Sequence, residues 1–81
     1  ELDGWVIEND SGINQLIKTY KFSNYAESVN FSNKVADLAE SEDHHPKIVL
    51  EYGSVEISWW SHKIKGLHKN DFICAAKTDL I

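Results

Sequence analysis

The chain has 81 residues, of which 42% are hydrophobic and 26% are charged. This length predicts a single domain over residues 1–81, and these ordinary fractions exclude a disordered, collagen-like or coiled-coil chain. Eight lysines against thirteen acids give a net charge of −5, and arginine is absent. Nucleic acid is therefore not an expected partner, because a protein that binds the phosphate backbone needs a basic face.

The lengths of the apolar runs and the number of cysteines indicate the cellular compartment to expect. No apolar run approaches the roughly 20 residues that span a membrane, and we expect neither a membrane segment nor a charged-then-apolar leader. Cys74 is the only cysteine and cannot form an internal disulfide. A lone cysteine favours a reducing, cytoplasmic compartment. A chain this short buries little surface by itself, so we also expect it to associate with further copies.

The first half of the chain predicts a hairpin followed by a helix. A short strand begins at Trp5, residues 10–12 have turn chemistry, and residues 13–22 form a second strand. Asn24 with Glu27 three residues later resembles a capping box, which predicts a helix from there to about Ser41. The inward stripe of this helix follows helical spacing, at Phe31, Val35, Leu38 and Ala39.

The second half repeats this order. Residues 47–52 and 55–61 alternate as strands, and Gly53–Ser54 between them suits a type II′ hairpin loop. A final helix is predicted over 67–81, with its inward side chains at Leu67, Phe72, Ala75, Ala76 and Leu80. The strand-strand-helix-strand-strand-helix order predicts an α+β fold, a four-stranded antiparallel sheet with both helices packed on one face.

The expected hairpin register brings histidines together. With Gly53–Ser54 as the loop, His45 lies directly opposite His62, and opposed Cβ atoms are ~4.5–5.5 Å apart. His44 is adjacent, and the acids Glu40 and Asp43 are close in sequence. We therefore expect three histidines to converge on the sheet face away from the helices, or at its edge.

Three interpretations of this histidine cluster remain open from the residues alone. Imidazole suits zinc, but His44 and His45 should point to opposite sides of an extended segment, and no cysteine lies near. Acid–base catalysis is the second, because histidine titrates near neutral pH and two imidazoles can divide the donor and acceptor roles. The third is structural, since short polar loops often contain histidines as caps or hydrogen-bonded spacers.

The spacing of these residues resembles a family signature. The signature residues are Glu40, His44, His45, Pro46, Tyr52, His62 and Asp71, and their spacing is similar to that of the pterin-4a-carbinolamine dehydratases. The resemblance extends over nearly the whole chain, through Gly4-Trp5, Lys18-x-Tyr20-x-Phe22-x-x-Tyr25, Val35-Ala36, Ala39-Glu40 and Gly66-Leu67. Several positions at correct spacing make this a specific signal.

The resemblance implies dehydration of 4a-hydroxytetrahydropterin to quinonoid dihydropterin and water, as part of tetrahydropterin recycling for aromatic amino acid hydroxylation. It implies no metal and no organic cofactor, a homodimer or homotetramer, and functional coupling to an aromatic amino acid hydroxylase. Some animal members of this family also act as dimerisation cofactors for a transcription factor. A non-catalytic interaction module is therefore the alternative function.

The resemblance also implies which residues contact the pterin. They are the His-His-Pro segment and the later segment that ends in histidine, here His44, His45, Pro46, Ser61 and His62. Our hypothesis is that His44 and His62 transfer protons and His45 orients the pterin. Glu40 would tune or position an imidazole.

Other signature residues have structural interpretations. Asp71 fits the N3 position of a capping box whose N-cap is His68, a residue that caps less well than the family's Thr or Ser and is not expected to be catalytic. Tyr52 and Trp59 share the inward side of their strands, whereas Trp60 points outward, to a subunit interface or onto the pterin. Cys74 is expected to be a buried filler rather than a nucleophile.

Overall fold

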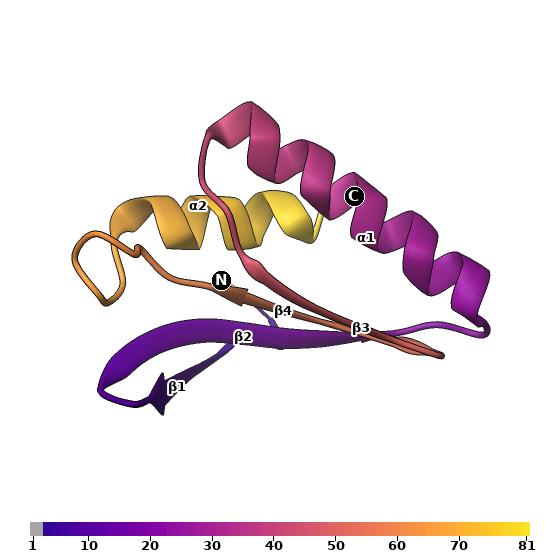
Figure 1. Ribbon diagram of the computed structural model, residues 1–81, viewed down its shortest axis with the longest axis horizontal. Coiled ribbons are helices and arrows are strands. Elements are labelled where there is room, and N and C mark those ends of the chain that lie inside the picture. The colour runs from indigo at the N-terminus through magenta and orange to yellow at the C-terminus, as the bar shows by residue number, and fades with distance from the viewer. Residues whose placement is uncertain (1–2) are drawn as a thin grey trace.

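A computed structural model describes residues 3–81. Its strands are β1 (Val6–Asp10), β2 (Ile13–Lys21), β3 (Lys47–Glu51) and β4 (Ser54–Trp59), and its helices are α1 (Tyr25–Glu42) and α2 (Lys69–Thr78). The strands form one antiparallel sheet in the order β1-β2-β4-β3, and both helices cover the same face of it (Figure 1). The expected α+β fold and element order are confirmed. Neither helix in this part of the chain is long and apolar enough to cross a membrane.

Helix α1 has the ends and the inward stripe that the sequence predicts. The Asn24 side chain accepts a hydrogen bond from the Glu27 amide at 2.8 Å, and the Glu27 carboxylate accepts one from the Ser23 amide at 2.9 Å. These bonds satisfy amides that would otherwise lack partners at the helix start. The predicted stripe faces the sheet, with Phe31, Val35 and Ala39 buried and Leu38 packed against the core.

The other end of α1 directs the chain toward the sheet edge. Asp43 takes the left-handed conformation with φ of 52°, and its amide bonds to carbonyls in the last helical turn. The next amide, that of His44, donates to the carbonyl of Ala39 at 3.1 Å. This closure is a common way to end a helix. It fixes where His44 leaves the helix.

The pairing register of the β3–β4 hairpin differs from the predicted register by two residues. Its loop is Tyr52–Gly53, so that Glu51 opposes Ser54 and Leu50 opposes Val55. Gly53 has φ of 78° and therefore occupies the loop position that requires a left-handed backbone. The expected loop Gly53–Ser54 was wrong because it placed the glycine first in the turn.

This correction changes two expectations and leaves the faces of the sheet unchanged. A shift of two residues keeps each side chain on its side of the sheet, so Val55, Ile57 and Trp59 remain buried under the helices. Tyr52, expected in the core, belongs to the loop and is 73% exposed. The direct opposition of His45 and His62 is also wrong, because strand pairing ends at Lys47 and Ser58.

Helix α2 is shorter than expected and turns a different face inward. It covers Lys69–Thr78 rather than 67–81, and Phe72, Ala76 and Leu80 are exposed, Leu80 at 86%. The buried residues are smaller or polar, namely Asp71, Cys74, Ala75 and Thr78. The large ring of Trp59 fills the space below the helix and its indole donates to the Thr78 hydroxyl at 3.2 Å. Small side chains on α2 are therefore what fits there, and Cys74 is the buried filler expected from the sequence.

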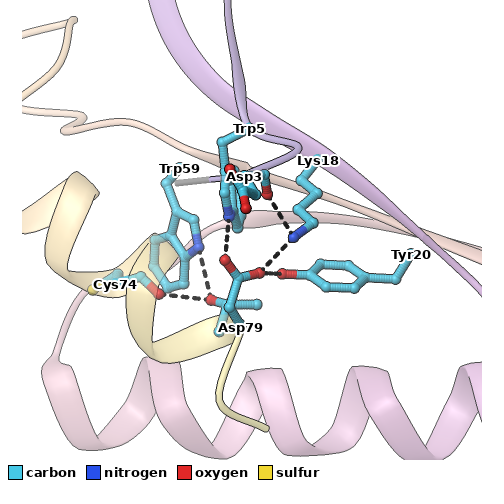
Figure 2. Close-up of polar contacts among 8 residues, drawn as sticks. Asp3, Trp5, Lys18, Tyr20, Trp59, Cys74 and Asp79 are labelled. Carbon is cyan, nitrogen blue, oxygen red and sulfur yellow. Dashed lines mark hydrogen bonds and ion pairs between the residues drawn. The ribbon is translucent and has the colours of Figure 1, made fainter. Parts of the chain in front are cut away.

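A polar cluster just past the end of α2 connects this helix to β2 and to the residue before β1 (Figure 2). Asp79 accepts hydrogen bonds from the Trp5 indole at 3.0 Å, from the Lys18 ammonium at 2.8 Å and from the Tyr20 hydroxyl. Burial acts to raise the pKa of Asp79, but these donors outweigh it and hold that pKa below its usual value. A Cβ on Gly4 would lie only 2.9 Å from Lys18 Cε. The Gly-Trp and Lys-x-Tyr motifs of the sequence are thus parts of one structural cluster.

Candidate active site

The candidate site is organised around the carboxylate of Asp71, which is completely buried in the first turn of α2. One oxygen accepts from the His68 amide and from the Ser61 hydroxyl, each at 2.8 Å, and the other contacts His44 Nε2 at 2.6 Å. A buried carboxylate needs such partners, because leaving it unpaired is costly. The expected capping role of Asp71 is therefore confirmed but incomplete, since the same carboxylate also holds His44 and Ser61.

His44 is held from two sides at the carboxyl end of α1. Its ring stacks on Trp59, with centroids 5.5 Å apart and planes 13° apart, and its side chain is only 17% exposed. Because a carboxylate can only accept, the Nε2 that contacts Asp71 carries a proton. The neutral ring then has an unprotonated Nδ1, which is the only ring nitrogen left for another molecule. A carboxylate that fixes the tautomer of an imidazole in this way is a recurrent catalytic arrangement.

His62 lies on the loop that follows β4 and is more exposed than His44. Its ring stacks on Trp60, with centroids 4.6 Å and planes 26° apart. The loop is closed by reciprocal backbone bonds between Ser61 and Gly66, at 2.8 and 3.4 Å. Trp60 therefore supports one catalytic candidate, as Trp59 supports the other.

His45 points to a different partner from that of His44. Its Nε2 lies 2.8 Å from a Glu40 oxygen, in a pair whose side chains are 57% and 80% exposed. Exposed pairs of this kind contribute little to stability, about 0–1 kcal/mol. Glu40 thus contacts one of the two histidines that follow it. The neighbouring acid Glu42 instead binds Lys77 at 2.5 Å and links the two helices.

These residues surround a pocket of about 560 Å³ between the ends of α1 and β4 and the start of α2. It is lined by Asp43, His44, His45, Ser61, His62, Lys63, Ile64, His68 and Asn70. The structure therefore brings together the three histidines and the serine predicted from the sequence, at the edge of the sheet. Glu40 and Pro46 are outside the lining, and Glu40 reaches it only through His45.

His68 also lines this pocket, although its sequence position did not predict it there. The signal available was its place three residues before Asp71, because a residue whose amide donates to that carboxylate must lie beside the other Asp71 partners. Within residues 3–81, no three or more histidine, cysteine, aspartate or glutamate side chains are grouped so that they could hold a metal ion. His44 and His45 each contact a carboxylate through Nε2, and the two carboxylates belong to different residues, Asp71 and Glu40.

Comparisons with known proteins agree with this architecture. The family model described as "Pterin 4 alpha carbinolamine dehydratase" matches residues 1–81. A Vibrio vulnificus protein with the provisional name pterin-4-alpha-carbinolamine dehydratase is 62% identical over the whole chain, which spans 74% of that protein. A Saccharophagus degradans protein of the same name is 60% identical over 98% of this chain and 70% of its own length.

Solved structures extend the likeness to the fold. A Brucella melitensis protein described as a transcriptional coactivator/pterin dehydratase superposes with a TM-score of 0.84 at 28% identity, over 98% of this chain and 82% of that one. A pterin dehydratase-like protein, identified as a RuBisCO assembly factor in the alpha-carboxysome, gives 0.78 at 23% identity, over 95% and 87%, and shows the fold alone. With the family model matched from end to end and curated relatives near 60% identity, the chain belongs to the pterin 4 alpha carbinolamine dehydratase family.

Proposed function

We propose that this protein removes water from 4a-hydroxytetrahydropterin to form quinonoid dihydropterin by histidine acid–base catalysis. Membership of the dehydratase family supports the substrate class. The observation that carries the proposed mechanism is the buried Asp71–His44 pair, whose second ring nitrogen is available to a pocket also lined by His62. Two imidazoles at one pocket suit a reaction that needs one proton delivered and another removed.

The reaction balances with two proton transfers. His62, in its protonated form, gives a proton to the 4a-hydroxyl as the carbon–oxygen bond breaks, and water leaves with that electron pair. His44 Nδ1 takes the proton from the adjacent ring N–H, whose electrons complete the carbon–nitrogen double bond. Exchange with solvent restores both rings. Asp71 contributes by keeping the His44 proton on Nε2 and the ring in place.

The remaining predicted residues have supporting roles in this proposal. His45 orients the pterin from the pocket wall, and Glu40 holds the His45 ring through the 2.8 Å contact. Ser61 donates to Asp71 and lines the pocket, so it steadies the carboxylate and lies within reach of the substrate. Pro46 shapes the chain between His45 and β3 without lining the pocket.

Turnover of freshly generated 4a-hydroxytetrahydropterin tests the proposal. We expect His44→Ala and His62→Ala each to lower kcat by about 10²–10⁴-fold, the usual contribution of a positioned acid or base, while circular dichroism stays native. Lys47→Ala, on the exposed start of β3, is a control that should retain full activity. Activity unaffected by a chelator is expected; its loss would favour zinc chemistry. Near-native rates in both histidine variants would overturn the mechanism.

The alternative function, a non-catalytic interaction module, is separated by the same assay. The Brucella melitensis relative is described by both a coactivator and a dehydratase name. A module would give partner binding with no turnover, and its binding would not depend on His44 or His62. We favour the enzyme because the module would have no use for an imidazole oriented by a buried carboxylate.

We further propose that the protein acts as a cytoplasmic homodimer or homotetramer that recycles pterin for an aromatic amino acid hydroxylase. Support for association comes from the sheet, whose outer strands β1 and β3 each have one edge without a neighbouring strand among residues 3–81. Val6 and Ile7 on β1 are more than half exposed. Light scattering on a size-exclusion column measures the state directly, and a monomer across micromolar concentrations would contradict it.

A further inference from the structure

His68 is the fourth histidine of the chain, and it lines the same pocket as the other three. It takes no part in the two proton transfers above. Its position is set by α2, because its amide donates to Asp71 and its side chain caps the helix start. A ring held in this way at the wall of a substrate pocket has a defined orientation.

The capping bond also determines which hydrogen bond the ring can offer. His68 Nδ1 accepts from the amide of Asn70 at 3.2 Å. A nitrogen that accepts carries no proton, so the ring proton lies on Nε2. Within residues 3–81, Nε2 has no protein partner. The side chain therefore presents one N–H donor, and the protein leaves that donor unused.

Other residues of the pocket wall also offer hydrogen-bond donors. Lys63 and Asn70 line the same pocket as His68, and both side chains carry N–H donors. Asp43 is the one carboxylate among the lining residues. A wall rich in donors suits a ligand group that presents acceptor oxygens.

We propose that His68 is a substrate-binding residue that donates its Nε2–H to an acceptor oxygen of the pterin. The inference rests on the proposed function and adds a specificity residue to it. A pterin offers such an oxygen in two places, the ring carbonyl and the hydroxyls of a side chain at C6. The two sources share the same chemistry, and ligands with and without the hydroxyls distinguish them.

The experiment is calorimetric titration with two 7,8-dihydropterins, which are not substrates for dehydration. One carries a methyl group at C6 and the other a dihydroxypropyl group. His68→Thr and His68→Ser keep a capping oxygen but lack the imidazole, whereas His68→Ala loses both. Because one neutral hydrogen bond is at stake, we expect Kd to rise about 2- to 10-fold in all three variants. The Tm should fall only in His68→Ala.

Comparison of the two ligands locates the acceptor oxygen on the pterin. A rise in Kd for both ligands assigns the bond to the ring carbonyl, and a rise only for the dihydroxypropyl ligand assigns it to the side chain. Lys69→Ala, at the next position of α2 and outside the lining, is the control expected to keep the wild-type Kd.

Two outcomes would overturn the inference. Unchanged Kd in His68→Thr and His68→Ser would show that the ring makes no bond to the ligand. A rise in Kd confined to His68→Ala, together with its lower Tm, would show that His68 serves only the helix. Failure of the proposed function is distinguishable, because the wild-type protein would then bind neither ligand and turn over no carbinolamine.

Discussion

Asp71→Asn is the substitution that most directly tests the chemistry of the site. The amide has nearly the shape of the carboxylate, so packing around the fully buried side chain is retained. One oxygen survives and can still accept from Ser61 and from the His68 amide. The other becomes an NH₂ group, and it faces His44 Nε2 across the present 2.6 Å contact.

The expected effect on stability follows from that one exchanged contact. A hydrogen bond to a charged group contributes about 1.5–3 kcal/mol. In a domain of this size each kcal/mol corresponds to roughly 4–8 °C in Tm, so Tm should fall by roughly 6–24 °C. The total stability of 81 residues is about 4–12 kcal/mol, so the variant should still fold at low temperature.

The effect on catalysis should be larger than that loss suggests. To accept from the new NH₂ group, the His44 ring must move its proton from Nε2 to Nδ1. His44 Nδ1 would then donate instead of accept, so it could no longer remove a proton. We expect kcat to fall by about 10²–10⁴-fold, measured at a temperature where circular dichroism shows a folded protein.

Asp43→Asn provides the matched comparison for this experiment. It removes a carboxylate from the same pocket, and asparagine tolerates the left-handed φ of 52° at that position. Its kcat should remain within a few-fold of wild type. An Asp71→Asn protein that is folded and turns over at the wild-type rate would refute the reasoning, because the tautomer of His44 would then be irrelevant.

Three further predictions concern the scaffold. Gly53→Ala should lower Tm more than Gly12→Ala, because both glycines have positive φ but only at Gly53 would the new Cβ lie 3.3 Å from the Phe22 carbonyl oxygen; equal losses in thermal melts would contradict this. Asp79→Asn should cost about 1–2 kcal/mol at pH 7, as its charge-assisted bonds are partly exposed. Because the folded pKa of Asp79 is lowered, that contribution is fully present above the ordinary value of 3.8 and is lost as the pH falls from there through the lowered folded pKa. The unfolding free energies of the wild-type and Asp79→Asn proteins, measured by urea titration, should therefore converge below about pH 4. A difference that stays constant with pH would contradict the role of Asp79 in this cluster. Burial, aided by the charges of Glu42 and Asp71, raises the pKa of Cys74 to about 11, so the thiol should react with a disulfide reagent at pH 8 far faster in urea than in buffer.

The sequence predicted the layers of this fold because periodicity reports which side of an element is apolar. It could not predict the hairpin register. Loops at Gly53–Ser54 and at Tyr52–Gly53 keep Ile48, Leu50 and Ile57 on the same face, since the two registers differ by an even number of residues. Both loops place Gly53 at a position that needs positive φ, so the glycine is compatible with either register. The inward face of α2 was missed for a related reason, because Trp59 had already filled the space that larger side chains would have needed.

Most residues of the candidate site could be predicted from the sequence, but the contacts between them could not. Spacing brought His44, His45, Ser61 and His62 to attention, and all four line the pocket. The link from His44 to Asp71 spans 27 residues and depends on how α2 lies over the end of the sheet. No local pattern carries that information. A capping role explained Asp71 sufficiently from the sequence, so its contact with His44 emerged only from the folded arrangement.

Helix α2 connects the stability of the fold to the orientation of the site. Near its amino end, Asp71 caps the helix and holds His44 with the same carboxylate. Just past its carboxyl end, Asp79 accepts from donors on β2 and from Trp5, the residue before β1. These contacts hold both ends of the helix, and a slide of the helix would move Asp71 away from His44. Small residues between the two acids let α2 lie close to Trp59, on which the His44 ring also stacks. The side chains that pack the helix are therefore also the ones that hold the proposed base in position.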